Sequence, residues 1–455
     1  MLEKVRAGAY PAAHWLRRPP GWVVWPLIGL LVAAGVGVGI DQAFRSGEVR
    51  YPWPPKPCVV QGVAARCGTF LVPENWAKPT GRTLGLRVVV LPAWSRHARI
   101  DAVTYLAGGP GEAATQQAAV LSQELTLLRD ERDILLVDQR GTGGSKPDNA
   151  DVTQYGTRAA MNDLDAVRAA LGYRQLDVIG SSYGATAAQI YAGLHPSSVR
   201  TLMLVAGTAL NVPFFSRYAV NAQRALDQLA SLCTSEPPCR TAFPDWEQKF
   251  GALVKAWNAH PVHGMTGDKL ASVIHAILLD TNKAVSIPLV VARAAKGDYT
   301  PLDHAGPGDL PWTIGPLPSI WCNEPWPGLD ASGPWGTLFD SYTTAQIAAV
   351  RHQCNSVPKH AEPRSLWTLP ASSPIPVLAL VGGADPQDPV TNLSDLKQHV
   401  RDSRIVVFPH VGHDFSIGNC PDAMMADFVA HATTKGLETT LCSEAAAVPP
   451  FPLTD

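Results

Sequence analysis

The stretch 178-VIGSSYGAT-186 places two serines between two glycines, directly after an apolar run. The run that ends at Ser181 is typical of a buried strand, and the residues from Tyr183 to Leu194 are typical of a helix. Ser182 is the middle residue of a G-x-S-x-G pattern between them. A turn this sharp needs small residues two positions before and two positions after its centre, and the glycines stand there only for Ser182. The pattern therefore predicts that Ser182 is a nucleophile, and the alternative is an ordinary serine-rich loop.

Strands and helices alternate around this turn. The apolar runs that we expect to be strands are 84–93, 102–108, 133–138, 176–181, 201–207, 376–385 and 404–410. The segments that we expect to be helices are 157–172, where Gly172 is the C-cap, 183–194 and 421–436. Strands that alternate with helices indicate an α/β fold, in which helices cover both faces of a mostly parallel sheet.

The alternation stops between residues 208 and 372, where the chain is helical in patches and rich in tryptophan and proline. We interpret this segment as one large, mainly helical lid inserted over the edge where open α/β sheets bind their ligands. The expected domains are 1–50 (cytoplasmic N-terminus, transmembrane signal anchor and linker), 51–207 (first part of the core), 208–372 (lid) and 373–455 (second part of the core).

A serine hydroxyl becomes a nucleophile when a base takes its proton and a carboxylate orients that base. On a fold that carries the serine on such a turn, the acid and then the histidine follow it along the chain. Asp385 is the first acid after the apolar run 377-VLALV-381, and Asp388 is the alternative. We therefore expect Asp385 to be the acid of a catalytic triad.

The histidine of the triad should follow the next strand, and both His410 and His413 do. We favour His413, because the preceding Gly412 lets the loop turn inward. Ser182, Asp385 and His413 then form the expected triad. Because all three positions are filled, a non-catalytic binding protein with this fold is disfavoured.

The tetrahedral intermediate of acyl transfer also needs N–H donors for its oxyanion. The backbone N–H of Tyr183, directly after the nucleophile, would be one donor. The loop 105-YLAGGPGEA-113 follows an earlier strand, and we expect Gly109 in it to supply the other; a plain turn at a strand end is the alternative. Beneath this loop, Asp138 and Arg140 are expected to form a buried structural pair.

Charge and motif content exclude other function classes. The chain has 37 Lys and Arg residues against 39 Asp and Glu residues, so no basic excess indicates nucleic acid as a partner. It contains no C-x-x-C or H-E-x-x-H pattern, and we expect neither a metal nor a cofactor. The sequence leaves the oligomeric state open.

Residues 19–40 carry no charge over a length that can cross a bilayer, and four basic residues precede them: Lys4, Arg6, Arg17 and Arg18. This order predicts a cytoplasmic N-terminus, with the rest of the chain extracytoplasmic and anchored to the membrane. We favour an uncleaved signal anchor, because the basic segment is long and no A-x-A pattern follows the apolar run. The alternative is a cleaved signal peptide and a secreted protein.

The eight cysteines fit an exported protein, because they are even in number and fall in local couples. The shortest loops would pair Cys58 with Cys67, Cys233 with Cys239, Cys322 with Cys354, and Cys420 with Cys442. Sequence alone does not fix connectivity, so this pairing of neighbours is an expectation.

Taken together, the motifs resemble those of the α/β-hydrolase peptidases of the prolyl aminopeptidase and tripeptidyl aminopeptidase group. They are GGPG after a strand, 138-DQRGTGGS-145, GSSYG, G-x-x-D-P and G-H, and the likeness extends from about Trp53 to Phe451. The 320-IWCNE-324 element and the C-terminal cysteine couple point to the secreted tripeptidyl aminopeptidase-like branch. The resemblance implies the α/β-hydrolase fold and an exopeptidase that attacks an amide bond near the free N-terminus of a short peptide. An esterase or lipase with the same triad is the alternative, because fold and triad do not choose the acyl group.

Three departures from the family's pattern concern carboxylates. The segment 205-VAG-207 stands where such proteins commonly have V-L-D-G, which leaves Asp385 without a rival there. Glu112 and Asp414 stand where small residues are more usual. Their negative charge would attract the amino group of a substrate or raise the basicity of His413.

A carboxylate held at a fixed distance from the nucleophile would pair with the α-amino group of a peptide and so measure from its N-terminus. Glu324 in the lid is our first candidate, because it follows Cys322 closely and lies between Trp321 and Trp326, whose rings would exclude water. Glu112 is the alternative for this role. The other interpretation of Glu324 is an exposed loop acid.

Overall fold

The computed structural model describes residues 53–146, 151–212, 214–304, 317–326, 331–368, 372–415, 419–439, 442 and 448–454. The chain divides into two units, 1–48 and 49–455, and the first lies entirely outside the described residues. The expected signal anchor at 19–40 therefore also lies outside them. Within the described ranges, no helix is both long enough and apolar enough to cross a membrane.

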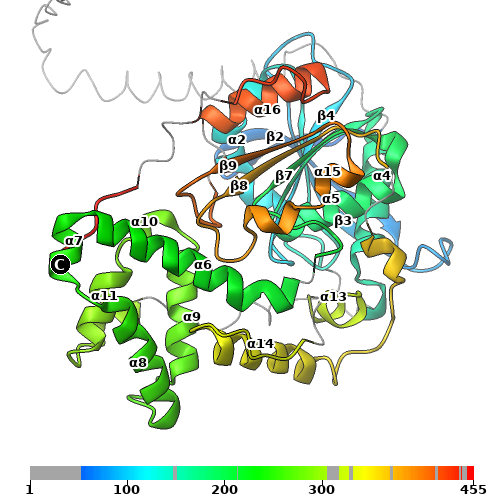
Figure 1. The fold of residues 1–455 in the computed structure, drawn as a ribbon. Coiled ribbons are helices and arrows are strands. Elements are labelled where there is room, and N and C mark those ends of the chain that lie inside the picture. The colour runs from blue at the N-terminus through cyan, green and yellow to red at the C-terminus, as the bar shows by residue number, and fades with distance from the viewer. Residues whose placement is uncertain are drawn as a thin grey trace, which may run out of the picture. The chain divides into compact units, whose positions relative to one another are not determined.

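Nine strands of the described chain form one sheet (Figure 1). The strands are β1 (Lys56–Val60), β2 (Val63–Pro73), β3 (Thr83–Leu91), β4 (Ala102–Leu106), β5 (Ile134–Val137), β6 (Leu176–Ser181), β7 (Val199–Val205), β8 (Val377–Gly382) and β9 (Ser403–Phe408). Their order across the sheet is β1-β2-β3-β5-β4-β6-β7-β8-β9. The first three strands pair antiparallel, as does β3 with β5, and every pair from β5 to β9 is parallel. The predicted α/β fold with a mostly parallel sheet is confirmed.

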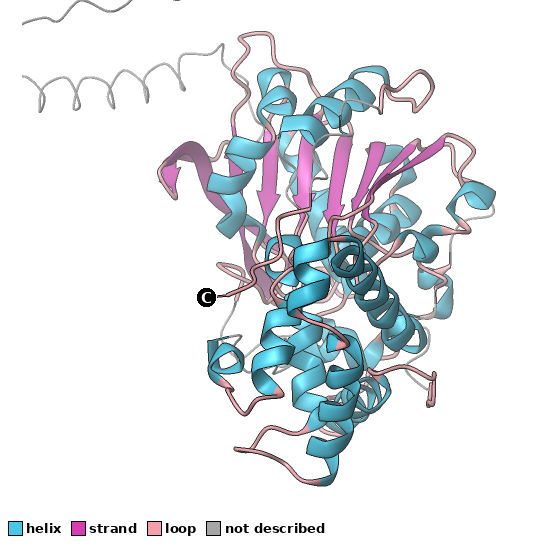
Figure 2. Cartoon of the chain, turned by 60° about the vertical axis from the view of Figure 1, so that its left-hand side comes forward, coloured by secondary structure: helices cyan, strands magenta, loops and turns pink. Residues whose placement is uncertain are grey.

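Helices cover both faces of the sheet and its carboxyl edge (Figure 2). The core helices are η1 (Ala114–Gln117), α2 (Ala118–Glu124), α3 (Thr126–Glu131), η2 (Val152–Gln154), α4 (Thr157–Leu171), α5 (Tyr183–Leu194), η3 (Pro196–Ser198), η6 (Val390–Leu393), α15 (Leu396–His399) and α16 (Asn419–His431). The insertion between β7 and β8 contains α6 (Phe214–Ser235), α7 (Pro237–Ala242), α8 (Trp246–Ala259), α9 (Gly267–Leu278), α10 (Thr281–Ala284), α11 (Ile287–Ala294), α12 (Thr300–His304), α13 (Leu317–Asn323), α14 (Asp340–Gln353) and η5 (Arg364–Trp367). In Figure 2 the central strands point toward these insertion helices.

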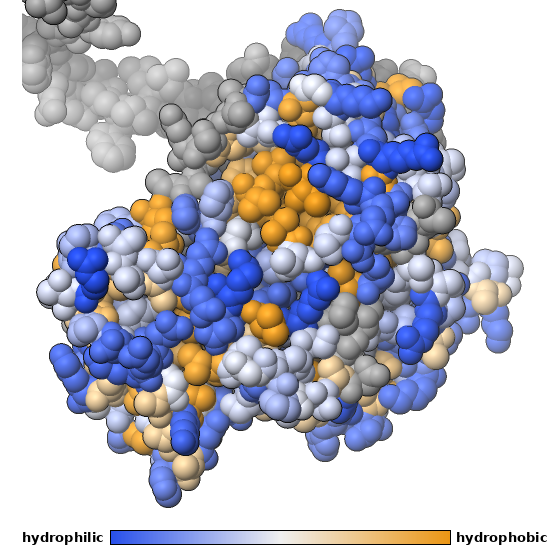
Figure 3. Space-filling model, in the orientation of Figure 1, coloured by the Kyte–Doolittle hydropathy of each residue, from blue (hydrophilic) through white to orange (hydrophobic). Residues whose placement is uncertain are grey.

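Alternate residues of the central strands point to opposite faces of the sheet. In β5, Leu135 and Val137 pack in the cluster that includes α4 and α5, whereas Ile134 and Leu136 pack in the cluster that includes α2, α3 and α16. All four are buried, because a parallel sheet covered on both faces needs apolar side chains on both sides. At the edge strand β9 the cover is incomplete: Val407 is 41% exposed, and Figure 3 shows apolar residues at the surface there.

Local geometry explains where some elements differ from expectation. The hairpin of β1 and β2 is not among the expected strands; its two-residue turn is Gln61-Gly62, with φ values of 50° and 81°. The helix α16 ends at His431, earlier than expected, because Ala432 has a φ of 50°. Gly172, with a φ of 81°, ends α4 as predicted.

Four disulfides join the eight cysteines in local couples. They are Cys58–Cys67 between β1 and β2, Cys233–Cys239 between α6 and α7, Cys322–Cys354 between α13 and the end of α14, and Cys420–Cys442 between α16 and the C-terminal tail. Such a set of disulfides is typical of a protein that folds outside the reducing cytosol.

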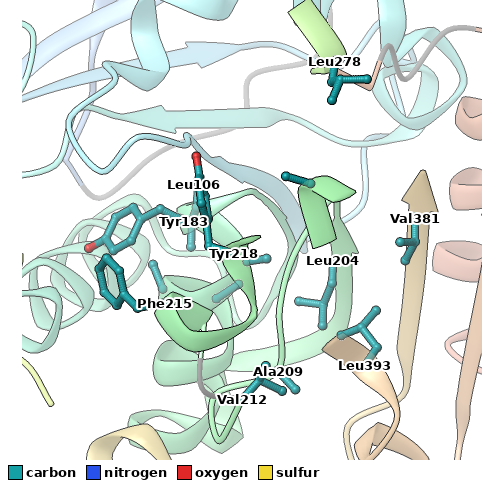
Figure 4. Close-up of a cluster of buried hydrophobic side chains, with 14 of the residues drawn as sticks. Leu106, Tyr183, Leu204, Ala209, Val212, Phe215, Tyr218, Leu278, Val381 and Leu393 are labelled. Carbon is teal, nitrogen blue, oxygen red and sulfur yellow. The ribbon is translucent and has the colours of Figure 1, made fainter. Parts of the chain in front are cut away.

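Apolar side chains fill the junction between the sheet and the insertion (Figure 4). Leu204 and Val381 come from β7 and β8, and Tyr183 comes from α5. Phe215 and Tyr218 of α6 lie in the same buried cluster. The insertion therefore shares the hydrophobic core of the sheet, which fixes it over the carboxyl ends of the strands.

Candidate active site

Ser182 lies at the turn between β6 and α5 and has a φ of 55°. A non-glycine residue rarely adopts this conformation, so the surrounding structure must hold it. A β-carbon on Gly180 would lie 2.2 Å from the carbonyl oxygen of Gly184, and one on Gly184 would lie 2.0 Å from the carbonyl oxygen of Leu106. Close backbone contacts therefore require both glycines of the G-x-S-x-G pattern.

The structure brings the three expected triad residues together. The Ser182 hydroxyl lies 3.0 Å from Nε2 of His413, and Nδ1 of His413 lies 2.9 Å from Oδ2 of Asp385. In this arrangement the imidazole can take the serine proton while the carboxylate holds the imidazole. Ser181 is the last residue of β6, and within the described part of the chain no hydrogen bond joins its side chain to His413.

The loop after β8, residues 383–389, fixes the carboxylate of Asp385; we call it the acid loop. Oδ1 of Asp385 accepts hydrogen bonds from the backbone N–H groups of Gln387, at 2.7 Å, and Asp388, at 2.8 Å. Oδ2 therefore remains for His413. Burial opposes ionisation of Asp385, but the charge of His413 and the two N–H donors outweigh it and lower the pKa of this carboxyl.

The alternative acid, Asp388, lies farther from the imidazole, with Oδ2 at 3.6 Å from Nδ1 of His413. It accepts a hydrogen bond from Thr208, and burial with the nearby charge of Asp385 raises its pKa to about 6. Burial alone would lower the pKa of His413, but Asp385, then Asp388 and Asp414, outweigh it and raise that pKa to about 9. His413 is therefore a stronger base than an ordinary histidine.

The two expected oxyanion residues line the pocket of the nucleophile. Gly109, Ser182 and Tyr183 all border it. Gly109 has a φ of 104°, and a β-carbon there would lie 2.7 Å from the backbone nitrogen of Gly111. A β-carbon on Gly108 would lie 3.2 Å from that of Ser182. Glycines in this loop therefore allow its backbone to approach the serine.

The pocket beside Ser182 has an aromatic wall that comes from the insertion. The ring of Trp326 lies between those of Trp321 and Trp367, with centroid distances of 4.1 and 4.2 Å, and lies 6.4 Å from the ring of Tyr183. Such a wall suits an apolar group of a ligand. His410, the alternative histidine, lines a different pocket, beneath α6.

Glu324 is buried next to this wall rather than exposed. Its carboxylate accepts hydrogen bonds from the backbone N–H of Thr157, at 2.6 Å, and from the Thr157 hydroxyl, at 2.9 Å. That hydroxyl lies 2.6 Å from the hydroxyl of Tyr183. Burial raises the pKa of Glu324 to about 7, although the bonds from Thr157 act in the opposite direction. Thr157 therefore links Glu324 to Tyr183 of the nucleophile turn.

Glu112 lies in the loop that carries Gly108 and Gly109 and is exposed. A β-carbon on Gly108 would lie 3.5 Å from Oε2 of Glu112. The same β-carbon would lie 3.2 Å from the β-carbon of Ser182, so the carboxylate is close to the nucleophile. Within the described part of the chain, no hydrogen bond or ion pair engages this carboxylate. A carboxylate beside the nucleophile is thus accessible to a ligand.

The expected pairing of Asp138 with Arg140 is wrong. Arg140 pairs with the buried Asp163 of α4, with Nε at 2.7 Å from Oδ2. Asp138 instead accepts hydrogen bonds from the backbone N–H and hydroxyl of Thr115 and from the N–H of Gly144. Arg140 and Asp138 thus have separate partners, and among the described residues neither hydrogen-bonds with the triad.

Sequence reasoning missed two residues that border the pocket. Trp367 completes the aromatic wall, but nothing in the local sequence 364-RSLW-367 relates it to Trp326. Nε2 of Gln387 lies 3.4 Å from Nε2 of His413. Its position two residues after Asp385 was the available signal.

Two family models match the chain. One, described as the alpha/beta hydrolase fold, matches residues 105–300, and another, described as TAP-like protein, matches residues 340–442. The first covers the turn at Ser182, and the second covers the segment with Asp385 and His413. These matches agree with the observed sheet and with the predicted fold.

Curated relatives match over shorter regions. Serine protease Hip1 of Mycobacterium tuberculosis is 26% identical over 223 residues, which are 38% of this chain and 42% of that protein. Tripeptidyl aminopeptidase of Streptomyces lividans is 25% identical over 223 residues, 38% of this chain and 40% of that protein. Proline iminopeptidase of Xylella fastidiosa is 35% identical over 102 residues, 22% of this chain and 31% of that protein. The chain thus spans less than half the length of these relatives, and the predicted resemblance to this peptidase group is confirmed.

Proposed function

We propose that this chain, which has the α/β-hydrolase fold, is a serine peptidase that releases residues or short peptides from the N-terminus of a peptide. The observation that carries the proposal is the continuous contact from Ser182 through His413 to Asp385, with distances of 3.0 and 2.9 Å. The peptidase names of the relatives support an amide as the bond that is broken.

The first half of the reaction would form an acyl-enzyme. Oγ of Ser182 attacks the carbonyl carbon while its proton passes to Nε2 of His413. Asp385 stays ionised and stabilises the imidazolium, and the N–H groups of Tyr183 and Gly109 bind the oxyanion. When the tetrahedral intermediate collapses, the C–N bond breaks and His413 gives its proton to the leaving amine.

The second half repeats these steps with water. His413 takes a proton from a water molecule, whose oxygen attacks the ester carbonyl of acylated Ser182. The intermediate expels Oγ of Ser182, which regains its proton from His413. The products are a carboxylic acid and the free enzyme.

We assign recognition of the substrate's α-amino group to Glu112 in preference to Glu324. The carboxylate of Glu112 is exposed beside Ser182, whereas both oxygens of Glu324 already accept hydrogen bonds from Thr157. An ammonium group that pairs with Glu112 would place a nearby peptide carbonyl at Ser182.

The experiment compares Glu112→Gln with Glu324→Gln on paired substrates. Glu112→Gln should raise KM about tenfold for peptide anilides with a free N-terminus, because about one charged hydrogen bond is lost. The KM for N-acetylated anilides should not change. Glu324→Gln should lower turnover equally on both, because it acts through Thr157 on the nucleophile turn. An equal change in KM on the two kinds of substrate in Glu112→Gln would show that Glu112 does not recognise the α-amino group.

An esterase or lipase is the second candidate, because the apolar wall of Trp321, Trp326 and Trp367 also suits an acyl chain. Parallel turnover of peptide anilides and p-nitrophenyl esters separates the two functions. A peptidase should hydrolyse both kinds of substrate, and an esterase should hydrolyse the esters alone.

We also propose that the protein acts outside the cytoplasm, anchored by residues 19–40. The uncharged length of that segment and the four disulfides support this location. Protease accessibility on intact cells tests this location. A protease added outside the cells should digest residues 49–455, and without protease the intact protein should be found in the membrane fraction. Protection of the whole chain would refute this location.

A further inference from the structure

Three polar side chains of α6 face the loops that carry the acid and the base. Asn221, Arg224 and Gln228 follow one another at spacings of three and four residues, which places them on one side of a helix. We call them the polar stripe. All three donate hydrogen bonds to backbone carbonyls, and none of these bonds is local in sequence.

Arg224 makes the closest contacts of the polar stripe. Nη1 donates to the carbonyl of Gly383 and Nη2 donates to the carbonyl of Asp385, both at 2.6 Å. One guanidinium therefore spans the start of the acid loop and holds the backbone of the acid itself. Its planar, rigid geometry suits two carbonyls at once, which a lysine ammonium does not reproduce.

The other two members extend the contact along both loops. Nδ2 of Asn221 donates to the carbonyl of Gln387, at 3.0 Å, in the middle of the acid loop. Nε2 of Gln228 donates to the carbonyl of Pro409, at 2.7 Å. Pro409 opens the loop 409–414 after β9, which carries His413 and which we call the base loop.

A second part of the insertion, the turn after α9 together with Thr281 at the start of α10, holds the base loop. The Thr281 hydroxyl donates to the carbonyl of His410, at 3.1 Å, and accepts from the N–H of Gly412, at 2.9 Å. The N–H of Asp414 donates to the carbonyl of Leu279, at 2.9 Å. These bonds lie on both sides of His413.

The base loop also needs a glycine because this turn approaches so closely. A β-carbon on Gly412 would lie 2.3 Å from the carbonyl oxygen of Leu279. The acid and base loops leave the sheet at β8 and β9, so their carbonyls have no strand partner and must be satisfied by other donors. The insertion supplies several of those donors.

We propose that the insertion is part of the frame of the triad: the polar stripe of α6 and Thr281 are positioning residues that hold Asp385 and His413 in line with Ser182. Displacement of α6 or of the α9–α10 turn would move the acid and the base while Ser182, on the sheet side, stays in place. The proposal rests on the proposed acyl transfer at Ser182, but not on a peptide as the substrate.

The first test replaces Arg224 and a matched residue of the same helix. Arg224→Met should lower kcat for a p-nitrophenyl ester about 10- to 100-fold, the effect of a misplaced catalytic group, with little change in KM. Arg224→Lys keeps the charge but not the two-carbonyl contact, so it should restore only part of the rate. Arg217→Met is the control, because Arg217 also donates from α6 to a core carbonyl, that of Thr391 at 2.9 Å, outside both loops. It should leave kcat unchanged.

The second test uses Thr281, where a matched pair of variants is available. Thr281→Val keeps the shape and removes the hydroxyl, and it should lower kcat with little effect on KM. Thr281→Ser keeps the hydroxyl and should restore the rate. A rate loss in both variants, with equal losses of thermal stability, would show that only packing matters there.

The rate at which a fluorophosphonate labels Ser182 separates the outcomes. If the unmodified enzyme is not labelled, the proposed function fails. If it is labelled, and Arg224→Met and Thr281→Val are labelled at the same rate with unchanged kcat, the positioning role alone is overturned. Near-ultraviolet circular dichroism shows whether Arg224→Met is folded. If it is not, Arg224→Lys and the Thr281 pair decide the question.

Discussion

Replacing Asp388 by Asn should move the pH profile of the enzyme toward lower pH. Oδ2 of Asp388 lies 3.6 Å from Nδ1 of His413, and two unit charges at that separation interact by about 1.2 kcal/mol even in the dielectric of water, or about 0.8 pKa unit. Both groups are largely buried, so this is the lower bound. The pKa of His413 is raised to about 9, and Asp388 is one of the charges that raise it.

The sign follows from the role of the base. His413 must be neutral to take the proton of Ser182, so kcat/KM falls as the pH drops through the pKa of His413. The neutral amide that Asp388→Asn introduces would no longer favour the imidazolium, which lowers that pKa. The acid limb of kcat/KM should therefore move down by about 0.8 pH unit or more in this variant.

The assay is the pH dependence of kcat/KM for a peptide anilide, between about pH 5 and about pH 10 in steps of about half a unit. Asp395→Asn is the matched control, since Asp395 bonds with Ser394 and Asn211 instead of with His413. Asp395→Asn should leave the acid limb of kcat/KM at the same pH. An unchanged limb in Asp388→Asn, or a limb moved to higher pH, would refute the reasoning about the charges around His413.

Two further predictions concern stability. Gly184→Ala should destabilise the fold by about 1–3 kcal/mol or more, because the new β-carbon would lie 2.0 Å from the carbonyl oxygen of Leu106; chemical denaturation measures it, and an unchanged midpoint would contradict the required close contact. Replacing both Cys420 and Cys442 by Ala should cost about 3 kcal/mol, since their bridge closes a loop with a sequence separation of 22, and denaturation of the double variant without loss would show that the bridge constrains little.

The nucleophile turn could be predicted because its requirements are local. Gly180 and Gly184 stand where neighbouring backbone leaves no room for a β-carbon, and this constraint appears directly as the spacing around Ser182. The order of serine, acid and histidine along the chain then leaves two candidates for the acid and two for the histidine. Parallel strands bring their carboxyl ends to one edge, which is why residues so far apart in sequence meet there.

The partners of buried charges could not be predicted, because they come from distant segments. Arg140 pairs with Asp163 of α4, and Glu324 accepts from Thr157 at the start of the same helix. Nothing in the sequence near Arg140 or Glu324 identifies these contacts. The hairpin turn at Gln61-Gly62 differs from these contacts, because its requirement for positive φ is local.

The polar stripe of α6 shows a third kind of limit. Asn221, Arg224 and Gln228 have helical spacing that is visible in the sequence. Their partners are backbone carbonyls, which every residue carries, so the pattern does not reveal what it contacts. The placement of α6 beside the acid and base loops shows which carbonyls the polar stripe contacts.

The identity of the residue that a fluorophosphonate modifies tests the central claim most directly. Labelled protein would be digested and mapped by mass spectrometry for the unmodified enzyme, Ser181→Ala and Ser182→Ala. The expected result is an adduct on Ser182 in the first two proteins and no adduct in Ser182→Ala, because the hydroxyl of Ser182 lies 3.0 Å from Nε2 of His413, the base that activates it. Persistent labelling of Ser182→Ala, or an adduct on Ser181, would contradict the account.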